Sequence, residues 1–379
     1  MPKYNQLQVG GYFLIIILAC LLAPLHTQAT TLPTTQQQSE DSPQNAVPVR
    51  TNGQVIYLTG STLMKDYTTA IIDHLKKYSN VPQPIIVNQG STRGIKAFCS
   101  GIGLNTPDIV TMSRRILSSE LDDCHANGVN DIIEIQIGYE ANGIVSARSD
   151  QDYRLTTVSL YKAIAAELPS NKDDFVQNTY RKWHDVDPNL PNTEIRMLIP
   201  TLGLGGRTFL EDKMLQAACR KMPDINAISS ASIRVKQCVA LRADGRVVDL
   251  DIPYDLNVVR TLATSAPGTL AVLPLHSIIA NQEALKLQPI DGIMPDHETV
   301  SNRSYKFIRP LYFLIKRDHI QDYWKNGLVF GLREFITEAT RESTLGPDGY
   351  LVKLGVFPLE KGKRDQLRAT SLRLDTLDR

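Results

Sequence analysis

Between residues 55 and 147, short apolar runs alternate with segments of helical spacing. We expect strands at 55–58, 84–87, 107–113, 131–147 and, further along, 195–199. The segment 64–78, between the first two strands, carries Ile71, Ile72 and Leu75 on one helical face. An alternation with this period predicts an α/β fold in which the connections cross the faces of a sheet.

A turn of small or hydroxyl residues follows each of the first three expected strands. The three turns are Gly60-Ser61-Thr62, Gly90-Ser91-Thr92 and Ser113-Arg114-Arg115. Ser and Thr are common helix caps, so a single turn of this kind would need no function. However, ligands bind at the carboxyl ends of strands in α/β sheets, and the first N–H groups of a helix attract anions. Three such turns at one edge therefore favour an anion pocket.

A fourth candidate element follows the strand expected at 195–199. The glycine-rich turn 201–206 precedes Arg207, which opens a helix. The turn offers N–H groups and the arginine a permanently charged fork of donors. The Gly-Lys-Ser/Thr ending of a nucleotide-binding loop is absent. Taken alone, the element is better explained as a flexible turn with a surface arginine.

The N-terminus is typical of an exported protein. Lys3, an apolar core at about 12–25 and Thr27-Gln28-Ala29 predict a signal peptide over residues 1–29. Lipoprotein processing at Cys20 is the alternative. Residues 30–53 are polar and contain prolines, which predicts a flexible leader.

Four cysteines remain after export, and in an oxidising compartment they are expected to form two disulfides. Spacing favours the sequential pairs Cys99–Cys124 and Cys219–Cys238. No metal site is expected, because Cys-x-x-Cys is absent and the histidines are scattered. A net charge of +1 argues against a nucleic-acid partner.

Several segments together resemble the substrate-binding protein of the bacterial high-affinity phosphate ABC transporter, a type II periplasmic binding protein. They are TGSTL (59–63), GSTRGIKAFCSG (90–101), PDIVTMSRRILSSELDDC (107–124), IEIQIGYE (133–140), GGRTFLEDKML (205–215), LPLHSIIANQEALKLQPIDGIMPDHETV (273–300), RPLYFLIK (309–316) and GPDGYLVKLGVFPL (346–359). The resemblance covers residues 54–359, and the paired cysteines make the chain look most similar to alphaproteobacterial members.

The resemblance implies two α/β lobes joined by two crossing strands, with the ligand in the cleft between the lobes. Lobe one would comprise residues 54–140 and 309–359, and lobe two residues 141–308. The charged segment 360–379 would follow as a tail, either as a short helix or as a frayed end.

The family's ligand residues can be carried over position by position. The resemblance places phosphate on Ser61, Thr62 and Leu63, on Ser91, on Ser113 and Arg114, and on Thr201, Gly205, Gly206 and Arg207.

Three positions depart from the family's pattern. Arg93 stands within what is commonly a run of glycines, and it would either add charge to the pocket or face solvent. Gly206 replaces a hydroxyl residue. Glu140 stands where the family commonly has aspartate. We expect its carboxylate to accept the proton that distinguishes phosphate from sulfate, although a glutamate at a strand end has an equally plausible structural role.

The implied function is a periplasmic binding protein that captures inorganic phosphate and delivers it to the permease subunits of an ABC transporter in the inner membrane. A monomer without a cofactor and without enzymatic activity is expected. The alternatives are an oxyanion sensor or adhesin on the same fold and, less favoured, a secreted hydrolase. The sequence contains no Gly-x-Ser-x-Gly elbow that would support the hydrolase.

Overall fold

The computed structural model describes residues 50, 53, 55–170, 174–201, 205–251, 253–320 and 328–377. The expected signal peptide, Cys20 and nearly all of the expected leader lie outside these residues. The chain divides between Ala46 and Val47 into two units, and all the described residues belong to the second. In that part of the chain, none of the helices combines the length and apolar character that a bilayer span requires.

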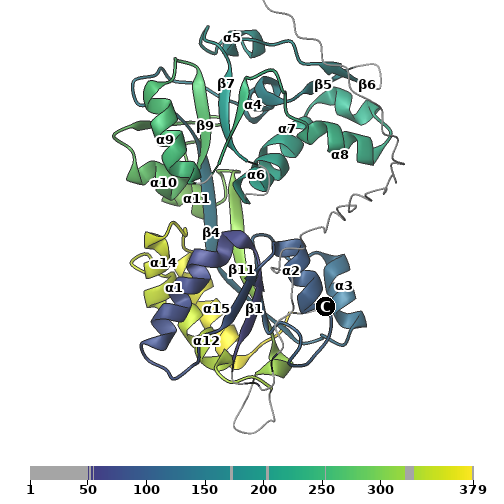
Figure 1. Ribbon diagram of the computed structural model, residues 1–379, viewed down its shortest axis with the longest axis vertical. Coiled ribbons are helices and arrows are strands. Elements are labelled where there is room, and N and C mark those ends of the chain that lie inside the picture. Colours follow the sequence, from purple (N-terminus) through teal and green to yellow (C-terminus); the bar gives the residue numbers. More distant parts are fainter. Residues whose placement is uncertain are drawn as a thin grey trace, which may run out of the picture. The chain divides into compact units, whose positions relative to one another are not determined.

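Lobe one is built on a sheet with the strand order β2-β1-β3-β11-β4 (Figure 1). Its strands are β1 (Tyr57–Gly60), β2 (Ile85–Asn88), β3 (Ile109–Met112), β11 (Ile308–Lys316) and the first part of β4 (Ile132–Ala147). The first three are parallel, and β11 runs antiparallel to both of its neighbours. Ile109 and Val110 pack into separate apolar clusters, so both faces of β3 are buried, as is usual for a parallel sheet.

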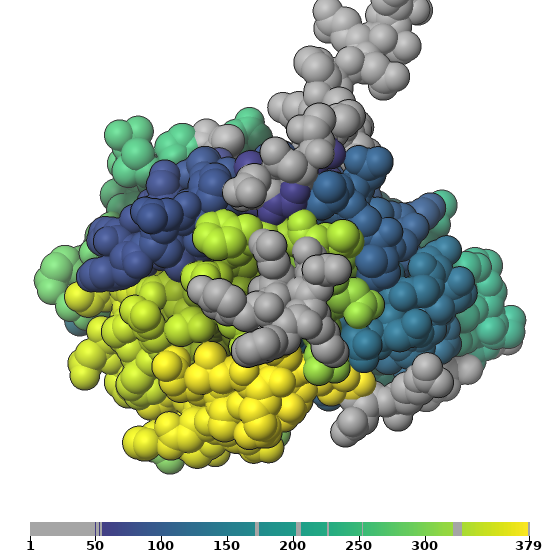
Figure 2. All heavy atoms as spheres, turned by 90° about the horizontal axis from the view of Figure 1, so that it is seen from below, coloured from purple at the N-terminus to yellow at the C-terminus, as the bar shows by residue number. Residues whose placement is uncertain are grey.

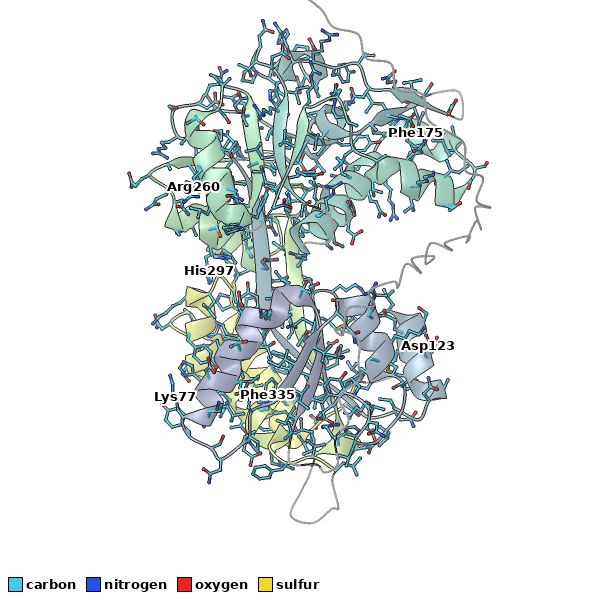
Figure 3. The ribbon with its side chains drawn as sticks, in the orientation of Figure 1. Lys77, Asp123, Phe175, Arg260, His297 and Phe335 are labelled. Carbon is cyan, nitrogen blue, oxygen red and sulfur yellow. A yellow bond between two sulfur atoms is a disulfide. The ribbon has the colours of Figure 1, made fainter. Side chains whose placement is uncertain are left out.

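Helices of lobe one cover both faces of this sheet. They are η2 (Thr62–Met64), α1 (Lys65–Lys76), α2 (Ser91–Phe98), α3 (Ser118–Ala126), η5 (Arg317–His319), α12 (Leu332–Ala339), α13 (Glu342–Leu345), α14 (Tyr350–Lys353) and α15 (Lys361–Arg373). The expected apolar face of α1 is confirmed, because Ile71, Ile72 and Leu75 are buried where α1 packs on α12. Phe335 of α12, labelled in Figure 3, packs edge to face against Phe313, with 5.2 Å between the ring centroids.

Lobe two is built on a second sheet, in which the last part of β4 lies between β10 and β9 and the order continues to β7 and β8. Its further strands are β7 (Arg196–Pro200), β8 (Val247–Leu250), β9 (Thr269–Pro274) and β10 (Leu285–Gln288), with the separate hairpin β5 (Glu167–Ser170) and β6 (Asp174–Gln177). Its helices are α4 (Thr157–Ile164), α5 (Trp183–Val186), α6 (Gly205–Phe209), the π-helical η3 (Leu210–Gln216), α7 (Ala217–Cys219), η4 (Pro223–Ala227), α8 (Ala231–Val239), α9 (Tyr254–Thr264), α10 (Leu275–Ala280) and α11 (His297–Ser301).

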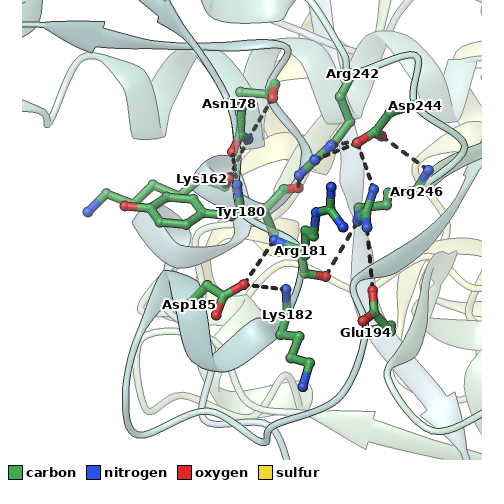
Figure 4. A network of polar contacts seen from close by, with 12 residues as sticks. Lys162, Asn178, Tyr180, Arg181, Lys182, Asp185, Glu194, Arg242, Asp244 and Arg246 are labelled. Carbon is green, nitrogen blue, oxygen red and sulfur yellow. Dashed lines mark hydrogen bonds and ion pairs between the residues drawn. The ribbon is translucent and has the colours of Figure 1, made fainter.

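A polar network fixes the start of β8 in this lobe (Figure 4). Arg242 donates two hydrogen bonds to Asp244, at 2.6 and 3.0 Å, and Arg246 donates a third at 2.8 Å. The hydrogen bonds from Arg242 outweigh partial burial and lower the pKa of Asp244 to about 2. Arg246 also pairs with Glu194, which precedes the neighbouring strand β7.

β4 and β11 connect the two lobes (Figure 1). Ala141 of β4 still pairs with Ile308 of β11 in the sheet of lobe one, whereas the next residue, Asn142, pairs with Pro274 of β9 in lobe two. The strand partners therefore change between residues 141 and 142. The α/β fold with two lobes and crossing strands is confirmed, while the expected residue limits of the lobes stay a prediction.

Close packing of α2 against the end of β1 requires glycine at positions 60 and 94. Gly60 has φ +126°, and a Cβ on it would lie 2.2 Å from the Thr111 carbonyl oxygen. A Cβ on Gly94 would lie 2.4 Å from the Cα of Gly60. Only glycine at both positions lets α2 press against the end of β1, which brings the turns after β1 and β2 together.

Both ends of the described chain are anchored on lobe one. Arg50, within the expected leader, is buried and donates to both carboxylate oxygens of Asp108, at 2.5 and 2.9 Å. At the other end the expected tail forms α15, which packs on α12 and β4. Figure 2 shows this C-terminal segment, in yellow, against the yellow-green residues that precede it. A frayed end is therefore wrong for residues 361–373.

Both expected disulfides are confirmed. Cys99–Cys124 joins the end of α2 to α3, and Cys219–Cys238 joins α7 to α8. All four residues are buried in apolar clusters.

Removing the second disulfide should destabilise the protein. Its residues are 19 apart, and loss of a link of this length costs about 3 kcal/mol by loop entropy. We expect Cys219→Ala/Cys238→Ala to lower the free energy of unfolding in urea by about that amount. Non-reducing peptide mapping of the parent provides the control, and four free thiols or crossed pairs would contradict the assignment.

Candidate functional site

A cleft of about 530 Å³ lies between the lobes, at the carboxyl ends of the parallel strands of lobe one. Its lining from lobe one is Ser61, Thr62, Leu63, Gln89, Gly90, Ser91, Thr92, Arg93, Ser113 and Arg114. The lining from lobe two is Thr208, Phe209, Asp212 and Lys213, and Arg309 comes from the crossing strand β11. Six hydroxyl side chains and four cations thus line the cleft, against the single carboxylate of Asp212.

The three turns of lobe one converge as expected. β1, β2 and β3 are parallel neighbours, so the residues after them lie side by side at one edge of the sheet. The Oγ atoms of Ser91 and Ser113 are 3.4 Å apart, and the Ser113 N–H donates to Ser91 Oγ at 3.2 Å. This contact holds the second and third turns together.

Backbone N–H groups are less available at these turns than the sequence suggests. The Ser61 N–H donates to the Thr111 carbonyl at 2.9 Å, so in this structure it already has an acceptor. The Gly90 N–H likewise donates to Gly60 O at 2.8 Å. The first N–H groups of α2, beginning at Ser91, have no partner within the helix and face the positive end of its dipole.

Arg114 is held at the edge of the cleft by Glu120. The guanidinium donates to both carboxylate oxygens, at 2.6 and 2.8 Å. Burial opposes ionisation of Glu120, but these bonds and the one from the Leu117 N–H outweigh it and lower the pKa of Glu120. Arg93 also lines the cleft. It is exposed and has no hydrogen-bond or ion-pair partner among the described residues.

Glu140 and Arg309 form a buried ion pair where the crossing strands meet. They are register partners in β4 and β11, and Arg309 donates to Glu140 Oε2 from Nε at 2.9 Å and from Nη2 at 2.6 Å. Their side chains are 2% and 8% exposed. The guanidinium also lies 4.8 Å from the ring centre of Phe209 in α6. The Glu140 carboxylate therefore already has a hydrogen-bond donor, the Arg309 guanidinium.

A smaller cavity of about 160 Å³, here called the inner cavity, adjoins the cleft and shares Leu63 and Arg309 with it. Glu140 and Gly206 line the inner cavity rather than the cleft. A Cβ on Gly206 would lie 2.9 Å from Pro200 Cγ, which explains why a hydroxyl residue is not accommodated there without a shift.

Like Gly206, the expected residues Thr201 and Arg207 do not line the cleft. Arg207 turns away and pairs with Glu211 at 2.9 Å and with Asp249 of β8 at 2.7 Å. Thr201 is also absent from the described linings of both cavities. Residues 202–204 lie outside the described residues, and the surroundings of Gly205 are not described. Binding of phosphate by the expected residues stays a prediction.

The sequence interpretation missed the residues that lobe two and the crossing strands contribute. Thr208, Asp212 and Lys213 follow Arg207 at spacings that place them on another side of α6 and η3. The sequence signal that could have identified Asp212 and Lys213 is their helical spacing from Thr208. Arg309 sits in an apolar strand, and nothing local marks it as part of a site.

Comparison with known proteins agrees with this architecture. A family model described as "PBP superfamily domain" matches residues 28–343. The curated proteins contain no match to the chain.

Several solved structures share the fold. A possible phosphate binding protein from Planctomyces limnophilus has a TM-score of 0.57 and 16% identity, over 84% of this chain and 98% of the other. PstS from Borrelia burgdorferi has a TM-score of 0.54 and 17% identity, over 81% and 99%. An ABC-type phosphate transport receptor from Vibrio cholerae has a TM-score of 0.54 and 15% identity, over 76% and 95%.

Proposed function

The chain belongs to the PBP superfamily, and from this premise we propose that it captures inorganic phosphate in the cleft and delivers it to the permease of an ABC transporter. The periplasm would be its compartment, and it would act as a binding protein rather than an enzyme. The possible phosphate binding protein from Planctomyces limnophilus and the ABC-type phosphate transport receptor from Vibrio cholerae share its fold and support the choice of ligand.

The composition of the cleft carries the proposal. Hydroxyl groups and the N-terminus of α2 donate hydrogen bonds to an oxyanion without adding charge. Arg114 and Arg309 add charge-assisted bonds, which are shorter and stronger than neutral ones. Each guanidinium is oriented by a carboxylate, Glu120 or Glu140, so its donors are already positioned before an anion arrives.

Closure of the lobes completes the proposed mechanism. A cavity of about 530 Å³ is much larger than one phosphate ion, so groups on both walls cannot all contact the ion in this arrangement. Hinge closure around a ligand is a common response in proteins of this architecture. The crossing strands β4 and β11 would flex, and Thr208 and Lys213 would approach the turns of lobe one.

Arg114 offers a direct test of the cleft. Replacing Arg114 with alanine removes a charged donor, and phosphate binding should weaken about 30- to 1000-fold, or about 2–4 kcal/mol. Isothermal titration calorimetry measures the change. Arg115→Ala is the matched control, because the Arg115 side chain is 70% exposed, pairs with Glu134 and does not line the cleft. Equal effects at the two positions would contradict the proposed site.

A further inference from the structure

Arg93 is the cation on the lobe-one wall of the cleft whose charge is not used by the protein itself. It stands in the first turn of α2, lines the cleft and is exposed. Among the described residues it has no hydrogen-bond or ion-pair partner. Arg114, by contrast, donates to both carboxylate oxygens of Glu120. Arg309 of the crossing strand is paired with Glu140. Arg93 is therefore the group best placed to accept a carboxylate from the opposite wall.

Asp212 is the matching group on the wall formed by lobe two. It lies in η3 and is the single carboxylate in the described lining of the cleft. Its side chain is exposed, and within the described part of the chain it accepts one hydrogen bond, from Gln216 Nε2 at 3.3 Å, and pairs with no cation. Lys213 is its neighbour in sequence, but adjacent residues on a helix do not face each other. Asp212 thus presents an uncompensated negative charge to the cleft.

Closure of the lobes would bring these two charges toward each other. Arg93 and Asp212 line the same cavity of about 530 Å³ from opposite lobes, and they are not paired in this arrangement. Opposite charges attract more strongly as the walls approach and water leaves the space between them. An arginine and a carboxylate can also form two parallel hydrogen bonds. The attraction between Arg93 and Asp212 therefore stabilises the closed arrangement and adds little to the open one.

We propose that Arg93 and Asp212 form an ion pair between the lobes, here called the latch, which exists only in the closed protein and holds the cleft shut over the bound anion. The inference rests on the proposed phosphate site and on closure of the lobes. It gives Asp212 a role in positioning the lobes rather than in contacting the anion. Lys213 is then the lobe-two cation of the described lining that faces phosphate.

Asp212→Asn separates the latch from a purely electrostatic role of this residue. A carboxylate beside an anion site repels the anion, so removal of its charge alone should tighten phosphate binding. Loss of the latch has the opposite sign, because the closed state loses an attraction that the open state lacks. We expect Asp212→Asn to weaken phosphate binding about 5- to 10-fold in calorimetric titration of the purified chain. An exposed ion pair reaches about fivefold, and exclusion of water from the closed cleft adds to this.

Exchange of the two charges tests the pairing itself. Arg93→Asp places two carboxylates on facing walls and should weaken phosphate binding by more than about tenfold. Arg93→Asp/Asp212→Arg restores opposite charges and keeps the net charge of the cleft, so its affinity should return to within about threefold of the parent. Lys96→Asp is the matched control, because Lys96 is exposed on the same helix but does not line the cleft. It should change binding little, and circular dichroism melts confirm that each variant folds.

Stopped-flow kinetics distinguish the latch from long-range attraction of anions. The latch acts after the anion has entered, so Asp212→Asn should raise the dissociation rate constant of phosphate and leave the association rate constant nearly unchanged. The latch is overturned if Asp212→Asn binds phosphate as tightly as the parent or more tightly, if the exchanged pair recovers no affinity over Arg93→Asp, or if only the association rate changes. If the parent itself does not bind phosphate, the proposed function fails and the latch fails with it.

Discussion

Replacing Arg309 with methionine is expected to weaken phosphate binding about 30- to 1000-fold, which corresponds to about 2–4 kcal/mol. The guanidinium lines both the cleft and the inner cavity, and it is the most buried cation of the cleft lining. Methionine retains an unbranched apolar side chain against Phe209 and removes the charge. The dissociation constant from calorimetry measures the effect.

Folding needs a separate control, because Arg309→Met also leaves the Glu140 carboxylate buried without its partner. Breaking a buried ion pair from one side costs about 3–5 kcal/mol of stability, whereas replacing both partners is often nearly neutral. The double variant Arg309→Met/Glu140→Gln should therefore recover most of the stability but not the binding. A double variant that binds phosphate as the parent does would show that Arg309 is only structural.

The second large effect concerns Glu140→Gln, which should lower the free energy of unfolding in phosphate-free buffer by about 3 kcal/mol. This is the lower end of the range for a broken buried pair, because glutamine keeps one oxygen for Arg309. The freed positive charge should attract any tetrahedral anion. Sulfate should therefore raise the melting temperature of the variant more than that of the parent.

Selectivity against sulfate should fall in the same variant. Glu140 was expected from the sequence to accept the proton of phosphate, and its ion pair with Arg309 adds a positioning role. Both roles predict that the ratio of phosphate to sulfate affinity drops by at least about tenfold, or about 1.4 kcal/mol. If the variant keeps both the parent's stability and the parent's ratio of phosphate to sulfate affinity, Glu140 takes no part in recognising the anion.

The lobe-one half of the site could be predicted because its signals are local. Glycine and hydroxyl residues mark where β1 and β2 end, and parallel pairing then brings Ser61, Ser91 and Ser113 to one edge. The helix of 64–78 was recognisable for the same reason, since its apolar spacing needs only neighbouring residues. The paired cysteines followed from their number and spacing.

The rest depends on contacts between distant residues. Arg309 meets Glu140 across 169 positions, through a pairing of crossing strands that no local pattern specifies. The turn before Arg207 matched the pattern of a ligand-binding loop. However, the Arg207 side chain pairs with Asp249 of β8, which lies 42 positions away in the sequence. The Ser61 N–H is likewise used by Thr111 of a neighbouring strand. Local turn chemistry predicts where donors occur, but tertiary pairing decides which remain available.

Calorimetric titration of the purified chain with phosphate and with sulfate tests the central claim most directly. Our account predicts saturable binding of one phosphate per chain, and sulfate binding at least about tenfold weaker. Absence of phosphate binding, or equal affinity for both anions, would contradict it.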